Sequence, residues 1–151
     1  MKTDRSLEYT FTEVYTKFKL HFYQRVFQRL KSREATLTAV ETFSIEIINA
    51  LGKPTVSEFA QFVDISVANA TYKVQSMIRK GYLRKERSEE DKRESHLMVT
   101  ERFFEYQKLS TNYINQVIKR IEDTCSLQDV EAFKRVLETM SDNLMPEIEL
   151  R

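Results

Sequence analysis

The chain has 151 residues, with 24 Lys or Arg against 23 Asp or Glu, so its net charge at neutral pH is +1. That length fits one domain with helical extensions, and apolar residues, 41% of the chain, fall in runs too short for a membrane-spanning protein. Two glycines and two prolines are too few for the turns of a β-rich fold, so we expect a mostly α-helical chain.

The charge is unevenly distributed along the sequence. Residues 1–35 carry eight basic and four acidic side chains, whereas residues 101–151 carry seven and ten. A local basic cluster, in which only Glu86 is acidic, consists of Arg79, Lys80, Arg84, Lys85 and Arg87. Such segregation suits an anionic partner, although a solvated helix end explains the charges equally well.

Few residues are suited to covalent or metal chemistry. His21 and His96 have no Cys or carboxylate at ligand spacing, so no metal site or cofactor is expected. The single cysteine, Cys125, cannot form an internal disulfide, and neighbouring acids disfavour its thiolate, which makes an inert thiol more plausible than a redox role. The sequence MKTDRSLEYTF lacks the apolar core of a signal peptide, so the expected location is cytoplasmic.

The first expected element is one long helix with an apolar stripe. Its apolar residues recur every three or four positions, at Leu7, Phe11, Val14, Phe18, Phe22, Val26 and Leu30. A stripe of this length commonly packs against a second chain, which predicts a dimer interface; an intrachain helical bundle is the alternative.

Two shorter helices follow, each with a capping-box sequence at its start. Thr38 with Glu41 opens one helix, which ends where Lys-Pro breaks the chain, and Thr55 with Glu58 opens the next, over residues 56–63.

A tight turn then leads into a fourth helix, from the N-cap Ser66 to Lys80, with Gly81 as its stop. The predicted buried face consists of Ala70, Val74, Met77 and Ile78. The predicted outward face is small or polar and free of acids: Val67, Ala68, Asn69, Thr71, Tyr72 and Gln75.

After Gly81, the runs YLRKERS and ESHLMV predict a two-stranded hairpin with a charged tip. Asp91 lies two residues before Arg93, a spacing at which its carboxylate can hold the guanidinium in a fixed position. Thr100 then starts a second long helix, and Ser126 with Asp129 caps the last one.

A capped helix, a tight turn, a second helix and a hairpin form a winged helix-turn-helix, a motif that binds double-stranded DNA. An enzyme would need a nucleophile with a base, a phosphate loop or a metal, and none is evident, so no catalytic residue is expected. A winged-helix adaptor that binds protein without sequence-specific DNA binding remains the alternative function.

The sequence resembles the MarR family of bacterial winged-helix regulators. The similarity is best in TVSEFAQFVDIS, NATYKVQSMIRKGYL and RSEEDKRESHLMVT, residues 55–100, and the order of helices extends it over nearly the whole chain. It differs from the family pattern at Asp64, where a turn glycine is usual, at Lys73, a normally apolar position, and in TERFFEY, which lacks a glycine often found after the wing.

The resemblance implies a single domain, with residues 1–35 and 101–151 as dimerisation helices and 36–100 as the winged helix-turn-helix. It also implies a homodimeric, ligand-responsive repressor on a pseudo-palindromic operator, with recognition helices in successive major grooves and wings over the minor groove.

The residues expected to contact DNA fall into two groups. Base contacts are expected from Ser66, Val67, Asn69, Thr71, Tyr72 and Gln75, and backbone contacts from Thr55, Ser57, Lys73, Arg84, Lys85, Arg87 and, held by Asp91, Arg93. A small-molecule effector pocket is expected at Tyr15, Phe18, Phe22 and Phe43, although aromatic residues at helical spacing are more often plain core.

Overall fold

The structure is a computed structural model that describes residues 4–30, 37–91 and 93–150, and the elements below are those of these ranges. In chain order they are α1 (Leu7–Leu30), α2 (Ala39–Ala50), α3 (Val56–Val63), α4 (Val67–Arg79), β1 (Leu83–Arg87), β2 (Ser95–Val99), α5 (Glu101–Thr124), α6 (Leu127–Thr139) and a short π-helix, η1 (Met140–Leu144). The predicted mostly helical fold with a two-stranded wing is confirmed.

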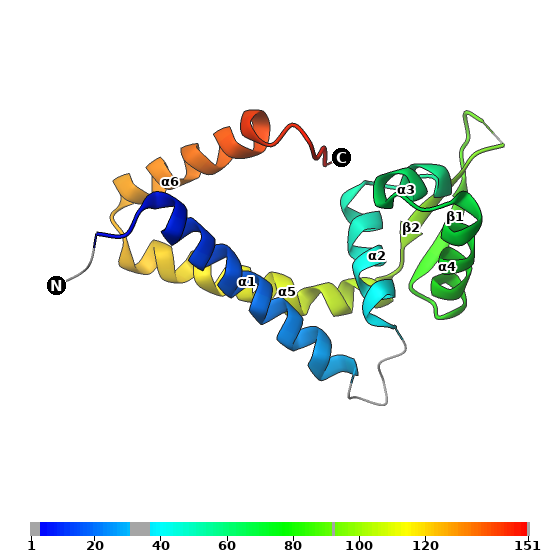
Figure 1. Ribbon diagram of the computed structural model, residues 1–151, viewed down its shortest axis with the longest axis horizontal. Coiled ribbons are helices and arrows are strands. Elements are labelled where there is room, and N and C mark those ends of the chain that lie inside the picture. Colours follow the sequence, from blue (N-terminus) through cyan, green and yellow to red (C-terminus); the bar gives the residue numbers. More distant parts are fainter. Residues whose placement is uncertain (1–3, 31–36, 92, 151) are drawn as a thin grey trace.

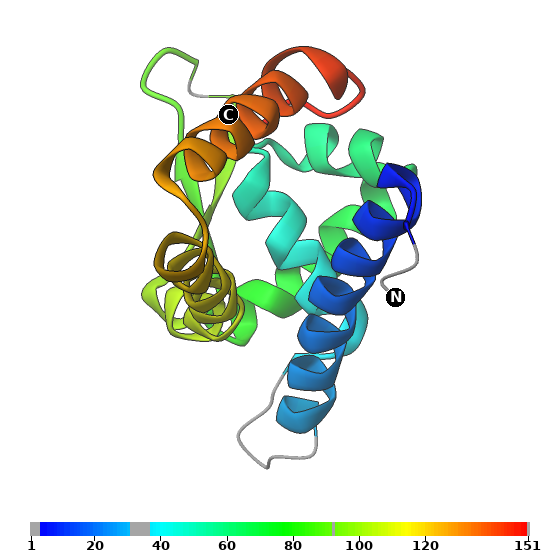
Figure 2. The same cartoon turned by 90° about the vertical axis from the view of Figure 1, so that its left-hand side faces the viewer.

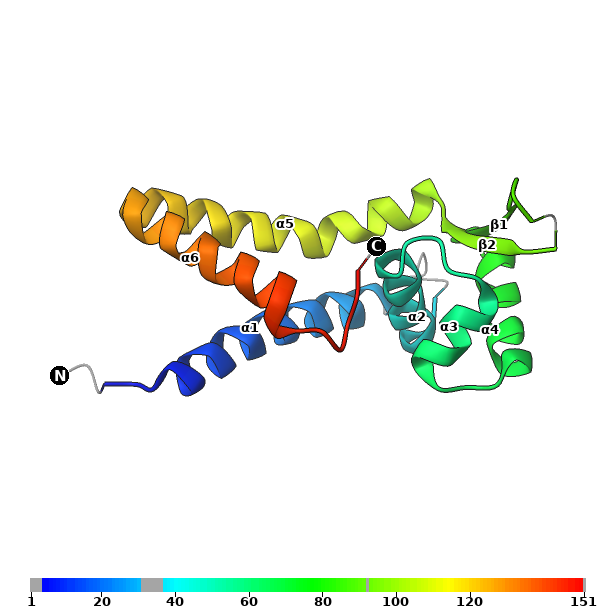
Figure 3. The same cartoon turned by 90° about the horizontal axis from the view of Figure 1, so that it is seen from above.

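The chain forms a head and a set of long arms (Figure 1). The head consists of α2, α3, α4 and the β1–β2 hairpin, whereas α1, α5 and α6 form the arms. Viewed along the arms, α1 and α5 pass on opposite sides of the picture in front of the head (Figure 2). Seen from above, α5 runs away from the wing and α6 turns back toward the head (Figure 3).

Local capping fixes the starts of the head helices. Both predicted capping boxes are present: the Thr38 hydroxyl accepts from the Glu41 N–H and the Thr55 hydroxyl from the Glu58 N–H, and each glutamate in turn accepts from the N-cap N–H. Ser126 likewise accepts from the N–H of Asp129 at 3.1 Å, as predicted for the last helix.

The core lies inside the head. Its buried side chains come from α2, α3, α4, both strands and the first turn of α5, and include Ile45, Phe59, Val74, Leu97 and Phe103. Burial of these apolar groups is the main force that holds α4 and the wing in fixed positions.

The segment before α3 is bonded to the wing, which the sequence did not predict. The Leu97 N–H donates to the Pro54 carbonyl at 2.8 Å, Thr55 pairs with His96 in an antiparallel bridge, and His96 Nδ1 lies 2.8 Å from the Lys53 carbonyl oxygen. The wing is therefore tied to the start of α3 as well as to the end of α4.

The arms leave much apolar surface uncovered in a single chain. On α1, the exposed fraction is 87% for Leu7 and 51% for Phe11, but 5% for Val26, so only the end nearer the head is packed. The Leu30 side chain lies outside the described residues. No residue of α6 is buried, and its exposed apolar side chains are Leu127, Phe133, Val136 and Leu137.

None of the helices within the described ranges combines the length and the apolar character needed to cross a membrane.

Candidate nucleic-acid interface

The turn between α3 and α4 is closed by its own backbone. Asp64 takes a left-handed conformation, with φ 56° and ψ 53°, and the Ile65 N–H donates to the Ala60 carbonyl at 3.0 Å. Aspartate is one of the few non-glycine residues that visit this conformation regularly, so the missing turn glycine leaves the helix-turn-helix intact. Ala60 is 2% exposed, as expected where the helices pack closely.

The two faces of α4 are as the sequence predicted. Ala70, Val74 and Met77 are fully buried, and Ile78 is partly buried against the same core. The opposite face projects away from the head: Val67 is 52% and Tyr72 71% exposed. Of the remaining predicted contact residues, Ser66, Asn69 and Gln75 are exposed and Thr71 and Lys73 are partly exposed.

Two hydroxyl groups of the expected contact surface already have partners within the helix. The Ser66 hydroxyl oxygen accepts from the Asn69 N–H at 3.1 Å and caps α4, while the Thr71 hydroxyl donates to the Val67 carbonyl at 2.8 Å. Each therefore has part of its hydrogen-bonding capacity left for an outside group. The Asn69 side-chain amide is exposed, and no contact to another described residue is recorded for it.

A buried carboxylate connects the start of α2 to the end of α4. Glu41 is 8% exposed, and its carboxylate accepts from Ser76 Oγ at 3.0 Å and from Lys80 Nζ at 2.6 Å as well as from the Thr38 N–H. Burial alone would raise the pKa of Glu41, but the hydrogen bonds from Lys80, Thr38 and Ser76 outweigh it, so the pKa lies below its usual value. Sequence reasoning missed this link, because the capping box already accounted for Glu41 locally.

Thr100 and Arg102 join the wing and α5 to the end of α4. Thr100 Oγ1 donates to the Gly81 carbonyl at 2.6 Å, and Arg102 Nη1 donates to the Lys80 carbonyl at 2.8 Å while its guanidinium lies over the Tyr82 ring. Gly81 itself has φ +83°, a conformation that glycine adopts readily, as its predicted role of helix stop requires. These contacts connect the start of α5 to the C-terminal end of α4.

The basic residues of β1 lie on opposite faces of the wing, with Arg84 on one face and Lys85 and Arg87 on the other. Arg84 pairs with Met98 and Lys85 with Leu97 in the antiparallel register, and alternate residues of a strand point to opposite sides. Lys85 and Arg87 are exposed and make no ion pair with any described residue. Arg84 instead lies with Nη2 3.8 Å from Met98 Sδ.

The tip of the wing differs from the prediction in one detail. The Asp91 carboxylate accepts from the backbone N–H of Arg93 at 2.9 Å, and no ion pair joins it to the guanidinium among the described residues. Asp91 therefore orders the loop backbone, and the Arg93 side chain is exposed. Ser88 supports the same loop, since its hydroxyl accepts from the N–H groups of Glu90 and Asp91 at 3.3 Å. Lys92 lies outside the described residues.

The four residues expected to form an effector pocket lie along the α1 side of the junction between arms and head. The Phe22 and Phe43 ring centroids are 6.3 Å apart, and Phe18 makes an edge contact with Tyr113 of α5 at 5.7 Å. Tyr15 lies farther out, 55% exposed, with Lys19 Nζ 4.6 Å from its ring centroid. The structure thus pairs Phe22 with Phe43 and Phe18 with Tyr113.

Among the described residues, no group of three or more His, Cys, Asp or Glu side chains is arranged to hold a metal ion. Cys125 is exposed at the end of α5.

Comparison with known proteins agrees with this geometry. The MarR family model matches residues 37–95, which contain the head from the start of α2 to the start of β2. By sequence, no curated protein matches the chain.

Solved structures share the fold over most of the chain. The transcriptional regulator Tm0710 from Thermotoga maritima is 17% identical, with a TM-score of 0.67 over 91% of this chain and 95% of that one. Streptococcus pneumoniae FabT, solved in complex with DNA, is 21% identical, with a TM-score of 0.60 over 92% and 95% of the two chains. S. aureus MepR bound to ethidium bromide is 15% identical, with a TM-score of 0.58 over 94% and 99%. Residues 37–95 are therefore similar to the MarR family, and these solved structures share the fold across at least 91% of the chain.

Proposed function

We propose that this protein is a homodimeric transcriptional regulator that binds double-stranded DNA sequence-specifically through α4 and the wing. The observation that carries the proposal is the outward face of α4, which is exposed, rich in hydrogen-bonding groups and free of carboxylates. Beside it, Lys85 and Arg87 of β1 are exposed and form no ion pair with any described residue. The structurally similar S. pneumoniae FabT, which was solved in complex with DNA, supports the proposal.

The dimensions of α4 suit the major groove. Its 13 residues span about 20 Å, and an α-helix with side chains is about as wide as the major groove. Asn69 is the strongest candidate for a base contact, because its amide can both donate to and accept from an adenine edge. The proposed contact surface continues along α4 with Val67, Tyr72 and Gln75. The hydroxyl groups of Ser66 and Thr71 can still form one more hydrogen bond each, because each already makes one bond within the helix.

Lys85 and Arg87 are proposed to neutralise phosphates, with Thr55, Ser57 and Lys73 beside them. Cations that are exposed and lack acidic partners lose little on leaving solvent to bind a phosphate, and binding then releases counterions. Arg93 is proposed to extend the contact at the wing tip, on a loop that Asp91 orders. Arg84 is the least suited of the predicted backbone contacts, because its guanidinium lies beside Met98.

The proposed homodimer pairs the arms of two chains. No residue of α6 is buried in the single chain, and the N-terminal half of α1 is similarly exposed. Because most of the stability of a helix comes from packing of its apolar face, both helices need a partner surface. Contact with a second copy would cover both and set two α4 helices at the spacing of half-sites about one helical turn apart.

Analytical ultracentrifugation tests the dimer. Val136→Glu on α6 or Phe11→Glu on α1 should convert dimer to monomer at micromolar concentration, because each puts a charge into the apolar contact. Phe62→Glu, on the exposed apolar surface of α3, is the matched control and should leave the dimer intact. A wild-type chain that sediments as a monomer would contradict the proposal.

A response to a small molecule is proposed for the aromatic residues Tyr15, Phe18, Phe22 and Phe43. Phe18, Phe22 and Phe43 lie where α1 meets α5 and α2, with Tyr15 farther out on α1. A ligand bound there would favour one angle between arms and head and change DNA affinity through that preference alone. Structurally similar MepR has been solved with ethidium bromide, an aromatic ligand.

Selection of duplexes from a random pool, followed by binding measurements at rising salt, tests the function. A DNA-binding regulator should enrich a pseudo-palindromic site and lose affinity steeply, by about tenfold or more for several phosphate contacts between low and physiological salt. A winged-helix adaptor that binds proteins would enrich no sequence and show weak or salt-insensitive binding. The adaptor remains the second candidate, favoured by the acidic residues Glu89 and Glu90 at the wing tip, which phosphates repel.

A further inference from the structure

The loop before α3 has an unusual backbone conformation. Lys53 has a φ of 55°, in the left-handed region that residues with a Cβ seldom adopt. It also precedes Pro54, and a residue in that position favours an extended conformation. A strained backbone of this kind persists only where surrounding contacts hold it, and such residues cluster at functional positions. The contacts that hold Lys53 therefore indicate what the loop does.

These contacts come from β2 of the wing. Two of them involve the backbone: the Leu97 N–H donates to the Pro54 carbonyl at 2.8 Å, and Thr55 pairs with His96 in an antiparallel bridge. The third is made by a side chain, because His96 Nδ1 lies 2.8 Å from the carbonyl oxygen of Lys53. His96 is thus the side chain that supports the strained residue itself.

The bond to Lys53 fixes the tautomer of the His96 ring. A carbonyl oxygen only accepts hydrogen bonds, so Nδ1 carries the proton and donates it. In the neutral ring Nε2 then has no proton. Nε2 lies 3.9 Å from Oε2 of Glu94, which is too far for a hydrogen bond. The single N–H of the neutral ring is therefore used on Lys53.

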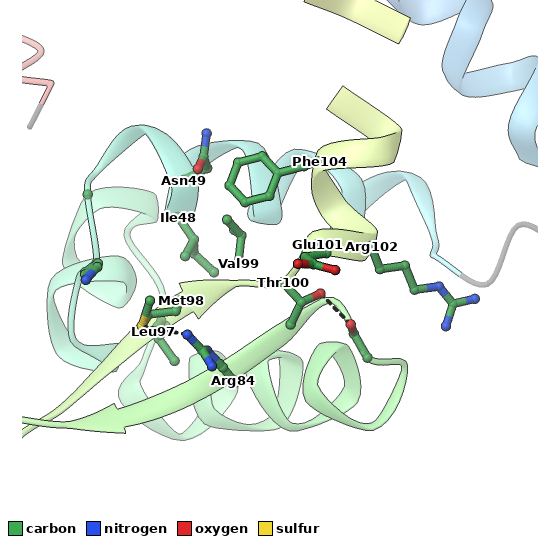
Figure 4. Close-up of a pocket in the computed structure, with 13 residues that line it drawn as sticks. Ile48, Asn49, Arg84, Leu97, Met98, Val99, Thr100, Glu101, Arg102 and Phe104 are labelled. Carbon is green, nitrogen blue, oxygen red and sulfur yellow. Dashed lines mark hydrogen bonds between the residues drawn. The ribbon is translucent and has the colours of Figure 1, made fainter. Parts of the chain in front are cut away.

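The strand β2 is attached to the head near both of its ends. Just beyond its C-terminal end, the Thr100 hydroxyl donates to the Gly81 carbonyl, a bond drawn as the dashed line beside Thr100 in Figure 4. Near its start, His96 attaches it to the loop before α3. Attachments near both ends fix the angle of the strand against α3 as well as its position.

We propose that His96 is the positioning residue of the wing. Its Nδ1–H bond holds Lys53 in the left-handed conformation, and this conformation places Thr55, the N-cap of α3, against β2. Thr55 and the β1 residues Lys85 and Arg87 belong to the proposed phosphate contacts, so the effect on DNA rests on the proposed function. His96 acts through the spacing between these groups and not through a contact of its own with DNA.

The first test uses the full chain labelled with ¹⁵N-histidine and no DNA, at about pH 8, where histidine side chains are neutral. The sequence contains two histidines, His21 and His96, and His21→Gln assigns their signals. We expect a long-range ¹H–¹⁵N spectrum to show His96 as the Nδ1–H tautomer. An Nε2–H tautomer would overturn the proposal, because Nδ1 then has no proton to donate to the carbonyl.

Hydrogen exchange of the Leu97 N–H measures the link between β2 and the loop. His96→Ala should speed this exchange about tenfold, as expected for the loss of one supporting hydrogen bond. His96→Asn should restore most of the protection, because its amide donates from a position close to that of Nδ1, whereas the longer His96→Gln should behave like His96→Ala. The control is the Ile65 N–H, which is bonded to the Ala60 carbonyl in the turn before α4 and should keep its rate.

Two results of the exchange experiment would overturn the proposal. If the Leu97 and Ile65 N–H groups exchange faster by the same factor, His96→Ala destabilises the whole head and positions nothing in particular. If His96→Asn exchanges as fast as His96→Ala, the Nδ1–H bond does not hold the loop.

The strained loop offers an independent variant. Asparagine adopts left-handed conformations more readily than lysine, so Lys53→Asn should slow the Leu97 exchange of the His96→Ala chain. An unchanged rate would show that strain at position 53 is not what His96 opposes, and it would overturn the proposal.

Affinity for the selected duplex tests the consequence for DNA. His96→Ala should bind about tenfold more weakly and with a smaller dependence on salt, because the wing cations are no longer held toward the phosphates, and His96→Asn should bind like the wild type. If the wild type binds DNA and His96→Ala binds equally well, His96 does not position the wing. If the wild type binds no DNA, the proposed function fails, while the tautomer and the exchange rates still decide whether His96 holds the loop.

Discussion

Lys80 at the end of α4 donates a 2.6 Å hydrogen bond to Glu41, a buried residue in the first turn of α2. The same carboxylate accepts from Ser76 one turn earlier in α4 and completes the Thr38 capping box. One acidic group therefore connects the start of α2 to the C-terminal half of α4. Thr100 and Arg102 also donate to carbonyl groups at the end of α4, those of Gly81 and Lys80.

Removal of one partner from this pair should be costly. Lys80→Met leaves the Glu41 carboxylate buried without its main counter-charge, so we expect the free energy of unfolding to fall by about 3 kcal/mol. Lys119→Met, which breaks the exposed pair with Asp123 on α5, is the control and should change stability by less than about 1 kcal/mol. Urea denaturation measures both. If the two variants lose the same small amount, the Glu41–Lys80 pair does not hold the head together.

The same pair predicts how the free energy of unfolding changes as the pH falls. The pKa of Glu41 is lowered in the folded state, so its contribution is fully present above the unfolded value, about 4.3, and is lost as the pH falls through the lower folded value. The stability difference between wild type and Glu41→Gln should thus be largest near neutral pH and shrink at acidic pH. A difference that stays constant down to acid unfolding would show that charge is not involved.

Glu46 should have the opposite pH dependence. Burial raises its pKa, and Oε1 is buried without a hydrogen-bond partner among the described residues. Ionisation therefore weakens the folded state once the pH exceeds the unfolded value, about 4.3. Glu46→Gln should raise the melting temperature at pH 7 and give no gain below that value. Glu131→Gln, on the exposed surface of α6, should give no gain at either pH.

Gly81 should tolerate asparagine better than alanine. A Cβ at this position would lie 3.6 Å from Arg102 Nη1, an ordinary contact, so the cost comes from its φ of +83°. Gly81→Ala is expected to lower the free energy of unfolding by about 1–2 kcal/mol, and Gly81→Asn by less, because asparagine adopts left-handed conformations more easily. Thermal denaturation compares them. Equal losses would point to packing instead of backbone strain.

The wing tip should contribute to DNA affinity and not to stability. Arg93→Ala should weaken binding about tenfold with an unchanged melting temperature, and Asp91→Ala should also weaken it by releasing the loop backbone. Glu89→Gln should bind DNA at least as well as the wild type, since it removes a charge that phosphates repel. Fluorescence anisotropy with the selected duplex measures all three, and unaltered affinity of Arg93→Ala would remove the wing from the proposed interface.

Much of the fold could be predicted because its signals are local. The capping boxes at Thr38 and Thr55, the N-cap Ser66 and the stop at Gly81 each depend on residues within one or two turns, and all four are confirmed. The faces of α4 followed from helical periodicity for the same reason.

Contacts between distant segments were not predicted. Glu41 and Lys80 are 39 residues apart, and the bond from Leu97 to the Pro54 carbonyl joins the wing to a segment with no strand signal. Arg84 lies beside Met98 because the strand register places the two residues opposite each other. The register could not be predicted from the sequence, because the hairpin lacks the glycine turn that would fix it. The sequence predicted that the Asp91 carboxylate holds the Arg93 guanidinium, whereas it accepts from the Arg93 backbone N–H, because the conformation of the loop decides which group of Arg93 lies within reach.

The most direct test of the central claim compares two changes on neighbouring surfaces of the head. Asn69→Ala removes a proposed base contact, and Lys85→Gln removes a proposed phosphate contact; both are measured on the selected duplex and on mixed-sequence DNA at several salt concentrations. We expect Asn69→Ala to lose about 1–3 kcal/mol on the selected site only, and Lys85→Gln to weaken both and lower the salt slope by about one. If neither variant differs from the wild type on either DNA, α4 and the wing are not the DNA-binding surface.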